Sequence, residues 1–100
     1  MSNRKQYNLK WAEEAGRDLG RLHRFLKKEN PKAALHALKR IKECSQMLQS
    51  YPEIGIKYDG GHQRELVASF GANAYILRYR IEKDGNILII RVWHSRETRH

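Results

Sequence analysis

The sequence predicts an α+β fold with the order β-α-α-β-β-β, in which a helical hairpin packs on a small antiparallel sheet. Apolar residues recur at helical spacing in the first half of the chain. The second half contains three strand-like segments joined by short turns. One hundred residues fit a single domain, so we expect residues 1–100 to form one domain.

The first half predicts a short strand followed by two helices. Residues 7–11 alternate polar and apolar side chains, and from Ala12 to Lys28 apolar residues recur every three or four positions. The pair Asn30-Pro31 favours a second helix start, because asparagine caps a helix and proline suits its first position. The short break before this pair predicts an antiparallel hairpin, and Pro52 places the end of the second helix before it.

The second half predicts strands at about 64–70, 75–82 and 86–93. Their short connections favour an antiparallel meander, whereas residues 51–63 are expected to form a loop. The last strand is apolar on both faces as far as Arg91, so we place it inside the sheet. In the middle strand, side-chain alternation assigns these residues to the core face: Tyr75, Leu77, Tyr79 and Ile81.

The composition indicates an anionic partner. Twenty Lys and Arg residues against eleven Asp and Glu give a formal net charge of +9, which favours nucleic acid, the ribosome or an acidic protein. No apolar run approaches the ~20 residues of a membrane span, and the polar N-terminus lacks a secretory signal, so we expect a cytoplasmic protein without membrane association. The five histidines and the one cysteine show no metal-ligand spacing, and no nucleotide-binding motif is present, so we expect neither metal nor cofactor.

A basic stripe follows one face of the first helix. Arg17, Arg21, Arg24 and Lys28 are spaced by four, three and four residues, which places them on the same side. One interpretation is a docking surface for nucleic acid or an acidic protein. The alternative is a solvated face that nearby acidic residues partly neutralise.

A second group of cations lies in the strand segments. If the strands pair as a meander, several of these side chains would converge on the sheet face away from the helices and clamp phosphates. A histidine among them would exchange a proton near neutral pH. The alternative is that Arg78 and Arg80 pair with Glu65, Glu82 or Glu97 and that the histidine only caps a strand end. The group comprises Arg64, Arg78, Arg80, Arg91, His94 and Arg96.

Nearly the whole chain resembles a toxin of the RelE/ParE superfamily, from bacterial type II toxin-antitoxin modules. The resemblance is carried by Trp11 at the end of the first strand and by the residues at 51–55, 64–67, 75–80 and 90–97, in this order and spacing. It implies the β-α-α-β-β-β fold that the spacing of apolar residues also predicts. The long helical hairpin and the ending Ile-Ile-Arg-Val-Trp-His look closer to the ParE-like branch.

The resemblance implies a growth-inhibiting, plasmid-stabilising toxin that binds a cognate acidic antitoxin. ParE-like members poison DNA gyrase, and we expect this activity here. RelE-like members cut messenger RNA on the ribosome, and this is the alternative; a non-toxic basic adaptor for nucleic acid or protein is a third hypothesis. The chain is expected to act as a homodimer or within a toxin-antitoxin hetero-oligomer.

The resemblance also implies site residues. In the nuclease alternative, catalysis would be metal-free and would use Arg64, His94 and Arg96, although the tail lacks the late tyrosine that this branch often has. We expect the remaining cations to bind the target or nucleic acid; they are Arg17, Arg21, Arg24, Lys28, Lys57, Arg78, Arg80 and Arg91.

Overall fold

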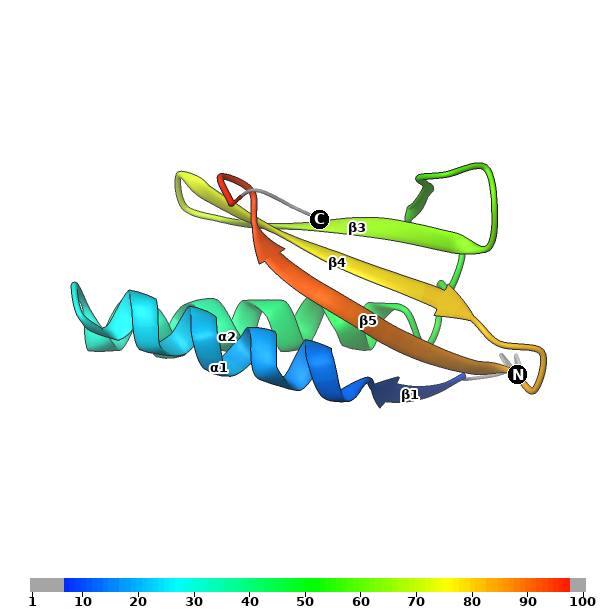
Figure 1. Cartoon of the computed structure of the whole chain (residues 1–100), viewed down its shortest axis with the longest axis horizontal. Helices are drawn as coiled ribbons and strands as arrows, with labels where there is room; N and C mark the ends of the chain where they lie inside the picture. The colour runs from blue at the N-terminus through cyan, green and yellow to red at the C-terminus, as the bar shows by residue number, and fades with distance from the viewer. Residues whose placement is uncertain (1–6, 98–100) are drawn as a thin grey trace, which may run out of the picture.

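The computed structural model describes residues 7–97, in which two helices cover one face of a five-stranded sheet (Figure 1). The predicted α+β order is confirmed, with one additional short strand. The elements are β1 (Asn8–Trp11), α1 (Glu13–Lys27), α2 (Pro31–Met47), β2 (Ile56–Lys57), β3 (Gln63–Phe70), β4 (Asn73–Ile81) and β5 (Asn86–His94).

The strands lie in the order β1-β5-β4-β3-β2. β3, β4 and β5 form the predicted antiparallel meander, and β5 is internal, as expected. β1 pairs with β5 in parallel, so the sheet is mixed. Residues 51–63 were expected to be a loop, but β2 lies within them and pairs with the start of β3. Two residues are too few to produce a recognisable alternation of apolar and polar side chains.

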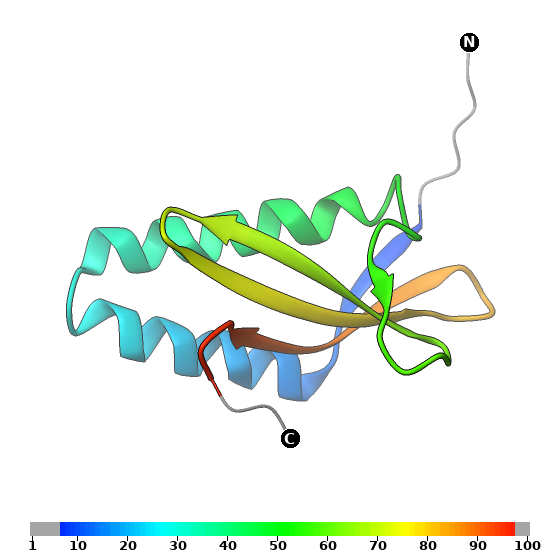
Figure 2. The same cartoon turned by 90° about the horizontal axis from the view of Figure 1, so that it is seen from above.

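The two helices run antiparallel and side by side (Figure 2). The predicted start of α2 is confirmed, because the Asn30 side chain accepts a hydrogen bond from the Ala33 N–H at 3.2 Å and Pro31 is the first helical residue. Neither helix is long and apolar enough to span a membrane in the described part of the chain.

The core lies between the hairpin and the sheet. Tyr75, Leu77 and Tyr79 of β4 are fully buried, as predicted, and pack with Ile41 and Leu48 from the second helix and its end. Burying each side chain of this size contributes about 1.5–3 kcal/mol relative to leaving it exposed. These contacts fix the sheet on the hairpin.

A β-bulge changes which side chains of β5 face the core. Arg78 pairs with Arg91, whereas the next residue of β4, Tyr79, pairs with Ile89, so Ile90 has no partner in the ladder. Simple alternation from Ile89 would place Arg91 in the core, but the extra residue shifts the pattern by one. Val92 is therefore the buried residue, and Arg91 is only partly buried.

Candidate partner-binding groove

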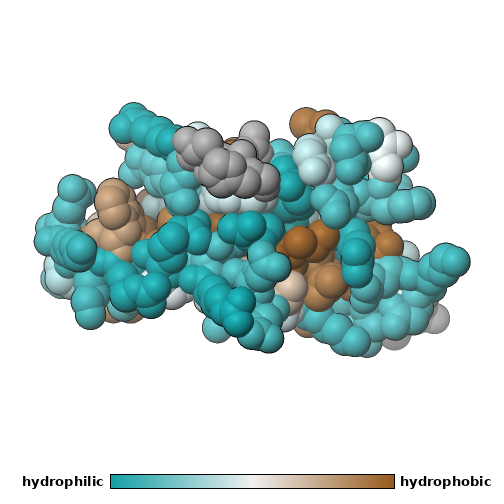
Figure 3. All heavy atoms as spheres, in the orientation of Figure 1, coloured by the Kyte–Doolittle hydropathy of each residue, from teal (hydrophilic) through white to brown (hydrophobic). Residues whose placement is uncertain are grey.

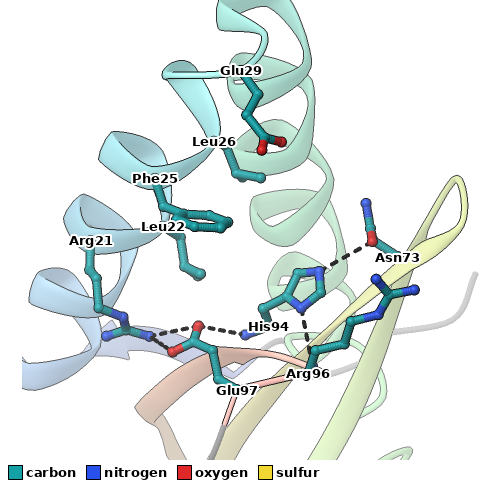
Figure 4. Close-up of a pocket in the computed structure, with 9 residues that line it drawn as sticks. All are labelled: Arg21, Leu22, Phe25, Leu26, Glu29, Asn73, His94, Arg96 and Glu97. Atoms are coloured by element: carbon teal, nitrogen blue, oxygen red, sulfur yellow. Dashed lines mark hydrogen bonds and ion pairs between the residues drawn. The ribbon is translucent and has the colours of Figure 1, made fainter.

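A groove of about 540 Å³ lies between the C-terminal half of α1 and the end of β5 (Figure 4). Leucine side chains and an aromatic ring from α1 form its apolar part. The polar side chains come from α1 and the turn after it, from the start of β4, and from the end of β5 and the turn that follows. Its lining residues are Arg21, Leu22, Phe25, Leu26, Glu29, Asn73, His94, Arg96 and Glu97.

Asp18 of α1 attaches the helix to the edge of β5. β1 ends where Trp11 pairs with Ile89, and beyond this point no strand within residues 7–97 pairs with that edge. The Asp18 carboxylate accepts hydrogen bonds there from the Val92 N–H and from Arg91 Nε, both at 2.8 Å. Burial by itself would raise the pKa of Asp18, but hydrogen bonds from Arg91, from the Val92 N–H and from Arg21 outweigh it and lower that pKa below its ordinary value.

Arg21 fastens the turn after β5 to the same helix. Its guanidinium pairs with Asp18 and with Glu97, the latter at 2.9 Å, and it donates to the Val92 carbonyl at 3.3 Å. Burial opposes the charge on Arg21, but its hydrogen bonds to the two carboxylates raise the pKa further. Glu97 also accepts the His94 N–H at 3.1 Å, so one wall of the groove is held by charge-assisted contacts.

Both ring nitrogens of His94 have neighbours. Nδ1 accepts the Arg96 N–H at 3.1 Å, and Nε2 lies 3.2 Å from Asn73 Oδ1. Because Nδ1 is an acceptor, this pattern assigns the ring proton to Nε2. The ring also lies edge-on to Tyr75, with 5.3 Å between the ring centroids. Within residues 7–97 no group of three or more acidic, histidine or cysteine side chains is arranged to hold a metal ion.

The expected convergence of Arg64 with His94 and Arg96 is not observed. Arg64 donates to the carbonyl oxygens of Glu53, at 3.2 Å, and Gly55, at 2.8 Å, and so holds the loop before β2. Arg64 and His94 lie on opposite sides of β4, four residues apart in register, which strand geometry converts to roughly 16 Å between Cα atoms.

The arginines of the strands are paired within the chain. Arg78 forms an ion pair with Glu65 at 2.7 Å and lies 3.8 Å from the centre of the Tyr58 ring. Arg80 pairs with Glu82 at 3.3 Å. The second interpretation of these residues, internal ion pairs, is therefore the one observed. Arg91 belongs to the Asp18 contacts described above, so the strand cations do not form one free cluster.

The basic stripe of α1 is divided. Arg17, Arg24 and Lys28 are exposed, and Arg17 pairs with Glu13 on the helix surface. Arg21 instead turns toward β5. Lys57, on β2, is also exposed. The stripe thus leaves exposed cations beside the groove and contributes one arginine to its wall.

Asp18, which holds β5 beside the groove, and Phe25, which lines it, were not among the predicted site residues. Asp18 lies three residues after Ala15 and four before Leu22, both buried, so its position on the apolar face was the available signal. Phe25 adjoins Leu26 but lies off the apolar stripe and is 62% exposed. An aromatic residue outside the stripe was the corresponding signal.

Comparison with known proteins identifies relatives over most of the chain. A family model described as ParE toxin of type II toxin-antitoxin system, parDE, matches residues 9–99. Toxin RelE3 of Caulobacter vibrioides is 38% identical over 85 residues, which cover 85% of this chain and 90% of the relative. Toxin RelE1 of the same organism is 32% identical over 85 residues, with 85% and 89% covered.

Two solved structures share the fold. The chromosomal ParDE system from P. aeruginosa matches with a TM-score of 0.72 at 23% identity, covering 89% of this chain and 96% of the other. The RelBE2 toxin-antitoxin complex from Mycobacterium tuberculosis matches with a TM-score of 0.63 at 22% identity, covering 97% and 100%. The arrangement of hairpin and sheet is therefore shared with both.

Proposed function

Since the chain belongs to the ParE toxin family of type II toxin-antitoxin systems, we propose that it inhibits bacterial growth by poisoning DNA gyrase. A cognate acidic antitoxin neutralises it in a toxin-antitoxin hetero-oligomer. Both proteins act in the cytoplasm, where gyrase is found.

The main support for this proposal is that the residues expected to catalyse RNA cleavage do not all lie together. Arg64 is bound to loop carbonyl groups at a distance from the groove that contains His94 and Arg96, so the three groups do not converge on one phosphate. His94 would also need a free ring nitrogen to accept a proton, and its Nδ1 is already occupied by the Arg96 N–H. Both observations favour an activity that depends on binding rather than on bond cleavage.

The exposed cations supply the attraction to the target in this proposal. Arg17, Arg24, Lys28 and Lys57 lie on the surface of the chain, whose net charge of +9 raises the rate of encounter with an anionic surface. The ion-paired arginines contribute less, because their nearest carboxylates offset their charge. These are Arg21, Arg78, Arg80 and Arg91, together with Arg17, which pairs with Glu13 on the helix surface.

A metal-free, ribosome-dependent endoribonuclease is the second candidate. The relatives named RelE toxins favour it, as does the position of Arg96 beside His94 in one groove (Figure 4). In this mechanism a ribose 2′-hydroxyl would attack the adjacent phosphorus as the bond from phosphorus to the 5′-oxygen breaks. His94 would accept the hydroxyl proton or donate a proton to the leaving 5′-oxygen, and Arg96 would stabilise the developing negative charge. Arg64 would take part only after leaving its loop carbonyl partners.

Two assays on the purified toxin test the proposal. Inhibition of gyrase supercoiling with intact message in a translation reaction is the expected result. Cleavage of message without inhibition of supercoiling would replace the proposal with the nuclease alternative. Normal growth on strong induction in bacteria, with neither effect in the purified assays, would leave the non-toxic adaptor.

A further inference from the structure

We propose that the groove between α1 and the end of β5 is a docking site for the acidic antitoxin, seating one apolar side chain and one neighbouring carboxylate. This inference rests on the toxin-antitoxin assignment and is independent of whether gyrase is the target. In this proposal the apolar side chain of the antitoxin contacts Phe25, Leu22 and Leu26, and its carboxylate binds Arg96.

The apolar part of the groove leaves hydrophobic side chains partly exposed to water. Leu22 is buried at its base and Leu26 is half-buried, whereas the ring of Phe25 is 62% exposed and projects into the opening (Figure 4). An exposed aromatic ring above buried leucines leaves apolar surface in water that a partner side chain can cover. Aromatic residues in such positions commonly dominate the binding energy of protein interfaces.

The charged residues of the groove indicate that the antitoxin carboxylate binds at the end where Arg96 lies. Arg96 is exposed, and among the residues that the structure describes no carboxylate pairs with its guanidinium. Glu97 is already neutralised by Arg21, so it does not compete for Arg96. Arg24 and Lys28 are exposed and adjoin the groove residues Phe25 and Glu29 in sequence, so they add positive potential near the groove.

The same charges favour an acidic protein over nucleic acid. Glu29 lies at the opposite end of the groove from Arg96 (Figure 4). A strand of RNA carries a phosphate at every nucleotide, so one passing through the groove would bring phosphates close to Glu29. A protein segment that places its carboxylate at Arg96 and an apolar side chain on Phe25 avoids this repulsion. Most of the accessible surface inside the groove is apolar, although many of its lining residues are polar, and this fits such a segment as well.

Calorimetric titration with the product of the small acidic reading frame adjacent to the toxin gene tests the proposal. We expect Phe25→Ala and Arg96→Gln each to weaken binding about tenfold or more, as interface anchors do. Leu35→Ala is the matched apolar control, because Leu35 is 61% exposed on α2 and lies outside the groove. Lys83→Gln, exposed in the turn between β4 and β5, is the charge control. Both controls should bind within about twofold of the wild type.

The thermal midpoint of each variant alone verifies folding, and Arg96 and Phe25 are exposed enough that both variants should fold. Unchanged affinity in both groove variants would overturn the proposal. So would unchanged antitoxin affinity combined with weakened binding of a single-stranded RNA oligonucleotide. A wild-type toxin that binds the antitoxin but does not inhibit supercoiling would end the gyrase proposal and leave this result intact.

Discussion

The carboxylate of Asp18 on α1 accepts the backbone N–H of Val92 on β5 at 2.8 Å. A helix side chain thus replaces the neighbouring strand at the point where β1 has ended. The same carboxylate binds Arg91 and Arg21, so a single acidic residue satisfies a backbone donor and two guanidinium groups. This contact determines where the end of β5, with His94, lies relative to α1.

Replacing Asp18 with alanine should destabilise the fold strongly. The change leaves the Val92 N–H and two partly buried arginines without their shared acceptor, and removal of one partner from such a network costs about 3 kcal/mol. Urea denaturation measures the loss. Glu13→Ala is the control, because its ion pair with Arg17 is exposed and should contribute less than about 1 kcal/mol. Equal losses of unfolding free energy in the two variants would contradict the prediction that the buried Asp18 contacts stabilise the fold more than an exposed ion pair does.

The lowered pKa of Asp18 predicts loss of stability in acid. A carboxyl group whose pKa is lower in the folded state stabilises that state above the unfolded pKa of about 3.9, and the contribution disappears as the pH falls through the folded value. The difference in unfolding free energy between the wild type and Asp18→Asn should therefore shrink as the pH falls below about 4. Urea titrations at several pH values measure this difference. A difference that stays constant or grows in acid would contradict the prediction.

The regular elements of the fold were predictable because they depend on local patterns. The cap at Asn30-Pro31, the meander and the buried face of β4 all follow from spacing within one or two elements. The parallel pairing of β1 with β5 was not predictable in this way, because it joins residues nearly eighty positions apart. Its four-residue length gives no signal for the direction of a partner.

The candidate site depended on features with no local signal. The bulge at Ile90 decides that Val92, rather than Arg91, is buried, and an extra residue in a strand leaves the apolar pattern nearly unchanged. The position of Arg64 depends on the path of the loop whose carbonyl groups it binds. The cationic residues of the strands could be listed from the sequence. Which carboxylate or carbonyl group each of them binds depends on the strand register and on the path of the loop, and neither could be predicted.

The hydroxyl of Tyr79 should anchor the loop before β2. It donates to the Pro52 carbonyl at 2.7 Å and accepts the Gly55 N–H at 2.9 Å. Tyr79→Phe removes both hydrogen bonds from a buried position and should lower the unfolding free energy by about 1–3 kcal/mol. Hydrogen exchange should become faster at Gly55. Unchanged exchange at this amide would contradict the anchoring role.

Replacing Tyr75, on the same strand, with phenylalanine should not destabilise the fold. The Tyr75 hydroxyl is buried and has no hydrogen-bond partner among the described residues, and burial raises its pKa. Removing an unsatisfied buried hydroxyl should leave stability unchanged or increase it by up to about 1 kcal/mol. Chemical denaturation beside Tyr79→Phe measures the contrast. A loss as large as that of Tyr79→Phe would indicate a bound water or another partner at this hydroxyl.

His94→Gln should distinguish the two candidate activities most directly. A general acid–base residue contributes about 10²- to 10⁴-fold to a reaction, so the nuclease alternative predicts that message cleavage falls by at least about a hundredfold. The gyrase proposal needs no proton transfer and predicts that supercoiling is still inhibited by the variant. Lys83→Gln serves as the control, because Lys83 is exposed in the turn between β4 and β5 and belongs to neither candidate site. Message cleavage by the wild type that falls about a hundredfold or more in a folded His94→Gln protein would contradict the gyrase proposal, since it would make the imidazole part of a cleavage reaction.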